Sequence, residues 1–200
     1  MFKFAKIEGC KMKTAYIIHG WDGSPKEPLY QWIKNKLEER NFKVIVPEMP
    51  NPSKPEINPW INKIKKVAGD LSDKDILIGH SVGCQAVLRY LGTLKNKKIA
   101  KTILIAPWMN LDETTIEEEG EEVKEIAKPW METPIDWKAV NNNCKEFIAI
   151  FSDNDPYVPL SNVNLFKEKL NAKILILNNK GHFDPFSGIK ELPEILEFVK

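Results

Sequence analysis

The sequence is poor in the residues that build disulfide-linked and metal-binding proteins. Its 200 residues include only three cysteines (Cys10, Cys84 and Cys144), which are odd in number, widely scattered and free of any C-x-x-C pair. Reduced thiols are therefore expected, as in a cytoplasm, rather than a disulfide framework. The three histidines and the cysteines form no cluster with metal-ligand spacing, so neither a metal nor another cofactor is predicted.

Long apolar runs and an excess of charge of one sign are also missing. No apolar run reaches the roughly 18 residues of a membrane-spanning helix. The first residues, M-F-K-F-A-K-I-E-G-C-K, lack the apolar region and cleavage site of a secretory signal. A net charge of +1 argues against electrostatic binding to nucleic acid or a membrane. We expect a cytoplasmic protein that acts on a small molecule, and its oligomeric state is left open.

Apolar segments alternate with helical patterns from Thr14 onward. The apolar segments lie at 15–18, 44–46, 76–78, 103–105, 147–151 and 174–177, and helical periodicity occurs around 29–39, 60–67, 82–94, 161–170 and 192–199. The apolar segments show little alternation, as in strands covered on both faces. The pattern predicts an α/β fold with a mostly parallel sheet of about six strands and helices on both faces. Residues 12–200 are expected to form a single domain, preceded by a short extension, 1–11, of unclear role.

Two segments depart from this alternation. Residues 47–59 contain five prolines and predict an ordered surface loop. Residues 107–137 carry an acidic run at 117–125, which is most simply a solvated helix face. Because this segment follows the carboxyl end of a strand, it is also the best candidate to cover a site there. Trp108 and Trp130 lie in it; core packing is their preferred role, and lining a pocket is the alternative.

The segment 76–83 reads I-L-I-G-H-S-V-G and carries the strongest functional signal. A strand, a G-x-S-x-G motif and a helix follow one another, which is the context of a nucleophile elbow. Gly79 and Gly83 lack a Cβ, and this permits so sharp a reversal of the chain. Ser81 is therefore predicted to be a nucleophile exposed at the end of the sheet. The alternative is a tight turn with an incidental serine.

A histidine is needed beside Ser81, because a serine hydroxyl attacks a carbonyl only when a base removes its proton. His80 adjoins the serine and its side chain is expected to project away from it, whereas His19 ends the first strand. Both are candidates for lining the pocket. His182 lies in N-K-G-H-F, directly after the last predicted strand, and is the predicted base. An ordinary loop histidine is the alternative.

The orienting carboxylate is expected between the serine and the histidine in sequence. Asp153 and Asp155 both follow the predicted strand at 147–151. Asp155 is preferred, because Pro156 stiffens the chain behind it, and Asp153 then forms the turn. Asp184 is a third candidate.

Acyl transfer also requires donors for a negatively charged tetrahedral oxygen. The backbone N–H of Val82 is one, because it follows the predicted nucleophile. A second donor is expected from the loop 19–25, H-G-W-D-G-S-P, whose glycines let the backbone approach a ligand closely.

These motifs together resemble the α/β-hydrolase fold and, more narrowly, the small serine hydrolases grouped with retinoblastoma-binding protein nine and the YdeN-like hydrolases. The matching pieces are Y-I-I-H-G-W-D-G-S-P, I-L-I-G-H-S-V-G-C-Q-A, F-S-D-N-D-P-Y-V-P and G-H-F, and they span the chain from about Thr14 to its end. The resemblance implies a reduced sheet with little or no cap. It also implies a nucleophile, an acid, a base and two oxyanion N–H groups at Ser81, Asp155, His182, Trp21 and Val82.

Ser152 departs from the family pattern, because many hydrolases carry glycine three residues before the acid. This leaves Asp153 open beside Asp155. The resulting hypothesis is a serine hydrolase that cleaves small carboxylic esters through an acyl-enzyme, with thioesters or amides as other substrates. The alternative is a hydrolase-fold protein that binds a protein partner and has lost useful catalysis.

Overall fold

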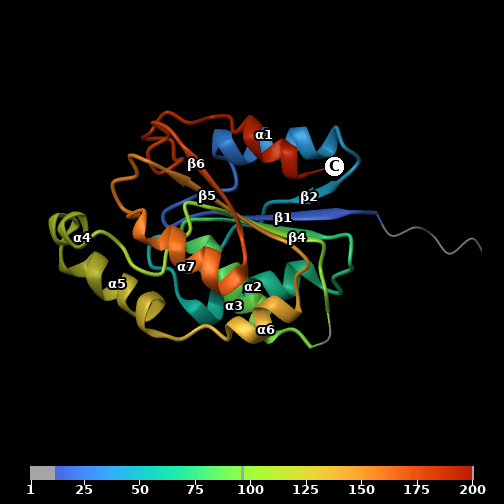
Figure 1. Ribbon diagram of the computed structural model, residues 1–200, viewed down its shortest axis with the longest axis horizontal. Helices are drawn as coiled ribbons and strands as arrows, with labels where there is room; N and C mark the ends of the chain where they lie inside the picture. Colours follow the sequence, from blue (N-terminus) through green and yellow to red (C-terminus); the bar gives the residue numbers. More distant parts are fainter. Residues whose placement is uncertain (1–11, 96, 200) are drawn as a thin grey trace, which may run out of the picture.

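Six parallel strands form one sheet in the order β2-β1-β3-β4-β5-β6 in the computed structural model, which describes residues 12–95 and 97–199 (Figure 1). The strands are β1 (Thr14–Ile18), β2 (Lys43–Ile45), β3 (Ile76–His80), β4 (Lys101–Ile105), β5 (Phe147–Ser152) and β6 (Lys173–Leu177). The predicted α/β class and the count of about six strands are confirmed. The arrangement is that of a reduced α/β-hydrolase fold.

Helices cover both faces of this sheet, as Figure 1 shows. One face carries α1 (Pro28–Glu38) and the 3-10 helix η1 (Pro193–Phe198), and the other carries α2 (Ile57–Ala68), α3 (Val82–Thr93), α6 (Trp137–Asn142) and α7 (Ser161–Leu170). The helices α4 (Glu113–Glu119) and α5 (Glu121–Glu132) stand at one end of the molecule. The segment predicted as a last α-helix is η1, where the N–H of Ile195 bonds to the carbonyl of Leu192, three residues back.

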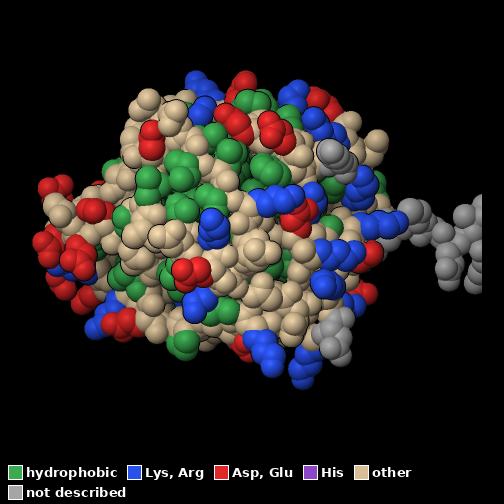
Figure 2. Space-filling view, viewed as in Figure 1, with side chains coloured by type: hydrophobic (Ala, Val, Ile, Leu, Met, Phe, Trp, Pro, Cys, Tyr) green, Lys and Arg blue, Asp and Glu red, His purple; other side chains and the backbone are tan. Residues whose placement is uncertain are grey.

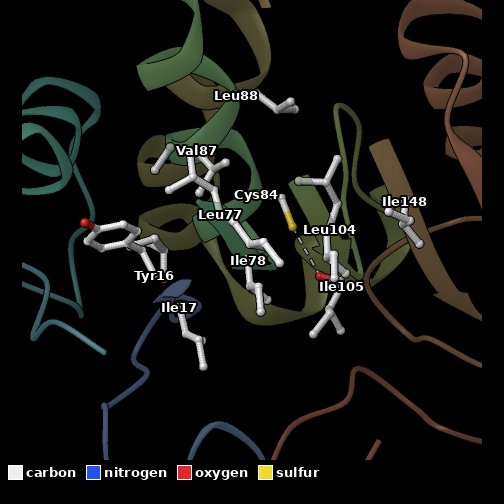
Figure 3. Packing of buried hydrophobic residues seen from close by; sticks show 14 of the residues in the cluster. Tyr16, Ile17, Leu77, Ile78, Cys84, Val87, Leu88, Leu104, Ile105 and Ile148 are labelled. Atoms are coloured by element: carbon white, nitrogen blue, oxygen red, sulfur yellow. Dashed lines mark hydrogen bonds between the residues drawn. The ribbon is translucent and has the colours of Figure 1, made fainter. Parts of the chain in front are cut away.

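The core lies on the inner strands and the helix α3. All residues of β1, β3 and β5 are buried, whereas the edge strand β6 is only half-buried. Figure 3 shows Leu77 and Ile78 of β3 packed among side chains of β1, β4 and α3. Burial on both faces explains why the central strands read as continuous apolar segments.

The proline-rich loop is held by its carbonyl groups. The indole N–H groups of Trp21, Trp60 and Trp130 donate to the carbonyl oxygens of Ser53, Pro50 and Pro55, at 2.9, 2.8 and 2.9 Å. A proline has no N–H to satisfy but keeps its carbonyl, so donors from outside the loop can order it. The loop is shorter than predicted: α2 begins at Ile57, and Pro59 lies in its first turn, where proline is tolerated.

The acidic helices at the end of the molecule are fastened to the core by Arg89 of α3. The guanidinium donates to the carbonyl oxygens of Trp130 and Thr133 at the carboxyl end of α5, both at 2.8 Å. A cation at a helix carboxyl terminus is electrostatically favourable. Figure 2 shows acidic side chains gathered at the end where Figure 1 places α4 and α5. The predicted cover is thus a pair of short helices with a solvated acidic face.

Candidate active site

Ser81 occupies a strained turn between β3 and α3. Its φ is +52°, a backbone conformation that residues with a side chain rarely adopt. The backbone N–H of Ser81 continues the sheet by donating to the carbonyl of Ile105 at 2.9 Å. The turn places the serine at the carboxyl end of a central strand, directly before a 12-residue helix. The strand–motif–helix context predicted from sequence is therefore present.

The two glycines of the motif are required by different neighbours. A Cβ on Gly79 would lie 2.7 Å from the Cα of Cys84, within the elbow itself. A Cβ on Gly83 would lie 2.5 Å from the carbonyl oxygens of Ile18 and His19, at the end of β1. Gly79 thus permits the reversal of the chain, and Gly83 permits α3 to approach the neighbouring strand.

Replacing Gly83 with alanine is expected to lower the free energy of unfolding by about 3 kcal/mol, since neither backbone carbonyl can move aside cheaply. The matched control is Gly92→Ala, in the same helix, where the added Cβ meets nothing nearer than Val140 Cγ2 at 3.8 Å. That variant is expected to gain about 0.5–1 kcal/mol from helix propensity. Urea unfolding of the two variants measures both changes, and equal stability would contradict the close approach at Gly83.

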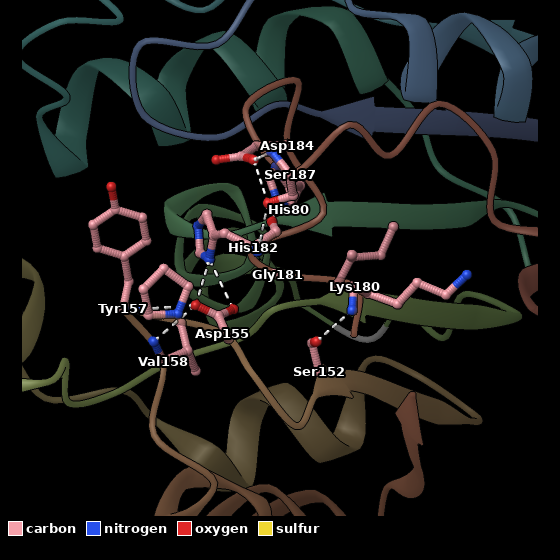
Figure 4. A network of polar contacts seen from close by, with 12 residues as sticks. His80, Ser152, Asp155, Tyr157, Val158, Lys180, Gly181, His182, Asp184 and Ser187 are labelled. Carbon is pink, nitrogen blue, oxygen red and sulfur yellow. Dashed lines mark hydrogen bonds and ion pairs between the residues drawn. The ribbon is translucent and has the colours of Figure 1, made fainter. Parts of the chain in front are cut away.

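Asp155 and His182 form a hydrogen-bonded pair at the ends of β5 and β6. The Nδ1 of His182 lies 2.8 Å from Oδ2 and 3.0 Å from Oδ1 of Asp155 (Figure 4). The carboxylate is held in turn by the backbone N–H groups of Tyr157 and Val158, at 2.9 and 3.0 Å. Only 2% of the Asp155 side chain and 11% of the His182 side chain are exposed. A carboxylate fixed in this way orients the imidazole and keeps its proton on Nδ1.

The neighbours of Asp155 hold the histidine loop instead of the imidazole ring. Asp153 accepts the backbone N–H of Asn179 at 2.8 Å, and Ser152 Oγ accepts that of Lys180 at 3.0 Å. Asn154 Oδ1 accepts the N–H of Gly181 at 2.8 Å. The Ser152 hydroxyl thus helps to hold the histidine loop in place. This gives a physical role to the residue that departs from the family pattern. Asp155, rather than Asp153, contacts the ring.

Asp184, the third candidate carboxylate, bonds to Ser187 instead of the His182 ring. Its Oδ1 accepts the hydroxyl and the backbone N–H of Ser187, at 2.6 and 2.7 Å. Ser187 Oγ also accepts the backbone N–H of His182 at 3.0 Å. Asp184 therefore supports the loop from its far side.

Ser81 and His182 line one cavity of about 500 Å³, together with Gly20, Trp21 and Trp108. Across the described residues no hydrogen bond joins the Ser81 hydroxyl to the His182 ring. Gly20 lies against the serine, since a Cβ there would be 3.3 Å from Ser81 Cβ. The N–H of Val82, at the first position of α3, has no acceptor within its own helix.

The loop that carries Trp21 is held beside this cavity. The N–H of Asp22 donates to the carbonyl of Pro52 at 2.9 Å, and the N–H of Gly23 donates to that of Gly20 at 3.2 Å. The proline-rich loop thus supports the loop expected to supply the second oxyanion donor.

His80 links three parts of the site through a buried network. Its Nε2 lies 2.7 Å from the backbone oxygen of His182, so Nε2 carries the proton, and its Nδ1 accepts from the Tyr30 hydroxyl at 2.7 Å. The same hydroxyl accepts the N–H of Gly20 at 3.3 Å. His80 also lines the cavity. Tyr30 was not identified from the sequence, because it lies on a helix with no motif and reaches the site only through packing.

Burial, together with the adjacent His182, lowers the pKa of His80 from 6.5 to about 4. In the unfolded chain this imidazole therefore takes up a proton near pH 6.5, whereas in the folded protein His80 stays neutral until the pH approaches 4. The free energy of unfolding should fall as the pH drops from about 6.5 to about 4, by up to about 3 kcal/mol from this residue, and no further below that range. Urea unfolding at several pH values in this interval should show a shallower fall for His80→Gln than for the unaltered protein. Equal slopes would contradict a neutral, buried His80.

His19 and Trp130 do not line this cavity, in contrast to Trp108 and His80. His19 is fully buried. Its Nδ1 lies 2.8 Å from the backbone oxygen of Gly20, and its Nε2 accepts the N–H of Met49 at 3.0 Å. Trp130 packs on Trp60 and lines a separate groove against the proline-rich loop. Lining of this cavity is wrong for both residues, and Trp130 packs in the core instead, because position at a strand end or in an insertion does not determine where a side chain points.

Two broader properties of the described chain concern ligands and membranes. Among residues 12–95 and 97–199, no three side chains of His, Cys, Asp or Glu are grouped so that they could hold a metal ion. None of the helices in these same ranges is long and apolar enough to cross a bilayer.

Comparison with known proteins identifies a family and two relatives of similar sequence. The model of the serine hydrolase family matches residues 15–200. The chain is 25% identical to YdeN of Bacillus subtilis (strain 168) over 187 residues, which is 94% of each protein. It is 26% identical to the serine hydrolase RBBP9 of Rattus norvegicus over 183 residues, which is 91% of this chain and 86% of that protein.

Solved structures share the fold. The crystal structure of the ydeN gene product superposes with a TM-score of 0.83 at 24% identity, covering 94% of this chain and 96% of that one. A structure from a study of carboxylesterases of Nitrososphaera gargenis superposes with a TM-score of 0.70 at 14% identity, covering 94% and 89%. At these identities the likeness is one of fold.

Proposed function

This chain belongs to the serine hydrolase family, and from that premise we propose that it hydrolyses small carboxylic esters through an acyl-enzyme on Ser81. The observation that carries the proposal is the hydrogen-bonded Asp155–His182 pair, whose imidazole lines the same cavity as a serine on a strained elbow. The fold is shared with a structure from a study of carboxylesterases, which makes carboxylic esters the first substrates to test.

In the proposed first step, the Ser81 Oγ attacks the carbonyl carbon of the ester while His182 Nε2 takes the hydroxyl proton. Asp155 stabilises the resulting imidazolium. No hydrogen bond joins Ser81 Oγ to His182 among the described residues, and we expect it to form when substrate binds, since such bonds tighten in the substrate complex. The backbone N–H groups of Trp21 and Val82 hold the negative oxygen of the tetrahedral intermediate.

In the second step the C–O bond to the alcohol breaks, and the alcohol leaves with the proton from His182. His182 then takes a proton from water, which attacks the acyl carbon. Collapse of the second intermediate releases the acid and returns the proton to Ser81. Thioesters and amides would pass through the same steps with a different leaving atom.

A fluorophosphonate probe tests the proposal directly, because an activated serine displaces fluoride from phosphorus and stays covalently modified. We expect stoichiometric labelling at Ser81, identified by peptide mass spectrometry, and none after the protein is unfolded in urea. Absence of labelling in the folded protein would contradict the proposal and favour a hydrolase-fold protein that only binds a partner.

A further inference from the structure

The cavity beside Ser81 carries negative charge on several sides. Four carboxylates line it: Asp22 and Glu27 from the loop before α1, Glu119 from α4 and Asp184 from the loop after β6. Within the part of the chain that the structure describes, no Lys or Arg lines this cavity. The carboxylates come from three separate segments that meet at this cavity, instead of forming one acidic run.

None of these four carboxylates is neutralised by an ion pair in the described ranges. Glu119 accepts the Tyr157 hydroxyl at 3.3 Å, Glu27 accepts the backbone N–H of Ser24 at 2.8 Å, and Asp184 is held by Ser187. Burial acts to raise the pKa of Asp184, but the hydrogen bonds from Ser187, together with the nearby His182 and His80, leave this pKa below its ordinary value. Asp184 is therefore ionised at neutral pH.

The rest of the lining offers little to an anion. Trp108, Leu111, Ile116 and Val123 form an apolar wall from the segment after β4, and Phe186 lies at the rim with 99% of its surface exposed. Desolvating a carboxylate or phosphate against such a wall is unfavourable unless a cation pairs with it. The N–H groups beside Ser81 are assigned to the reacting oxygen and are not free to hold a second anion.

On the basis of the proposed function, we infer that this site selects esters without negative charge and rejects anionic ones, including thioesters of coenzyme A. A cleft lined by one sign of charge changes the local concentration of charged ligands by about tenfold or more. The same field that excludes anions also stabilises the imidazolium formed during acyl transfer. The carboxylates of the cavity lining thus determine specificity without taking part in the reaction.

The test compares two esters that differ only in a terminal carboxylate: p-nitrophenyl butyrate and mono-p-nitrophenyl succinate. We expect kcat/KM for the butyrate to exceed that for the succinate by about tenfold or more at low salt, with the difference shrinking as salt is added. Butyryl-coenzyme A should likewise be cleaved more slowly than the uncharged butyryl thioester of N-acetylcysteamine.

Charge-neutralising variants assign the effect to the cavity. The double variant Asp22→Asn/Glu119→Gln should narrow the butyrate-to-succinate ratio by about threefold or more. The matched control is Glu113→Gln/Glu118→Gln, which removes the same charge from exposed positions of α4 that do not line the cavity. The control should leave the ratio unchanged.

The outcomes separate this inference from the proposed function. Equal kcat/KM for both esters, with turnover that depends on Ser81, overturns the selectivity and leaves the ester hydrolase standing. A ratio that is the same in both double variants overturns the role of Asp22 and Glu119. Absence of Ser81-dependent turnover of either ester overturns the inference together with the proposed function.

Discussion

Replacement of Ser81 with alanine is expected to reduce kcat for p-nitrophenyl acetate by about 10⁴–10⁶-fold. The variant has no oxygen to form the acyl-enzyme, and the remaining N–H groups can only assist direct attack by water. The free energy of unfolding should change by less than about 1 kcal/mol, because the serine hydroxyl makes no hydrogen bond among the described residues. Assays of ester hydrolysis measure kcat, and urea unfolding measures the free energy of unfolding.

Ser53→Ala is the matched control for this variant. Ser53 is exposed, and it contributes only its backbone carbonyl to the contact with Trp21, which alanine retains. Its turnover should equal that of the unaltered protein. Ester hydrolysis by Ser81→Ala near the unaltered rate would show that another group performs the reaction.

Replacement of Asp155 with asparagine is expected to lower kcat by about 10⁴-fold. The side-chain oxygen of asparagine can still accept the N–H groups of Tyr157 and Val158, so the turn is retained. Its NH₂ group, however, would donate to His182 Nδ1 and move the ring proton to Nε2. A protonated Nε2 cannot accept the proton of Ser81, which is why the loss appears in kcat.

Asp153→Asn separates this effect from a general disturbance of the loop. Asp153 bonds to the backbone N–H of Asn179, and asparagine can accept the same bond. We expect activity within about threefold of the unaltered protein, since no change in the imidazole tautomer follows. Similar losses in the two variants would mean that Asp155 acts only by holding the loop.

The elbow was predictable because its requirements are local. Gly79 and Cys84 meet within five residues of chain, so sterics alone demand glycine there, and the apolar residues before it and the helical periodicity after it define its ends. The proximity of Asp155 and His182 was predictable for a topological reason. Both follow the carboxyl ends of adjacent parallel strands, and such ends lie at one edge of a sheet.

The supporting network was not predictable from spacing. Tyr30 reaches His80 across 50 residues, and its hydroxyl also meets Gly20. The position of a helix over a sheet depends on how many side chains pack at once, which no local motif encodes. For the same reason His19 turned inward to Met49, and Trp130 turned to the proline-rich loop.

Sequence alone determined the parallel sheet, the strained serine and the set of candidate acids and bases, since these follow from backbone sterics and hydrophobic periodicity over a few residues. Only the tertiary structure decided that Asp155 and not Asp153 meets the imidazole, and that carboxylates from three distant segments line one cavity. Those outcomes depend on side-chain directions and on contacts between segments far apart in the chain. The free energy of each such contact depends on the packing of the whole core.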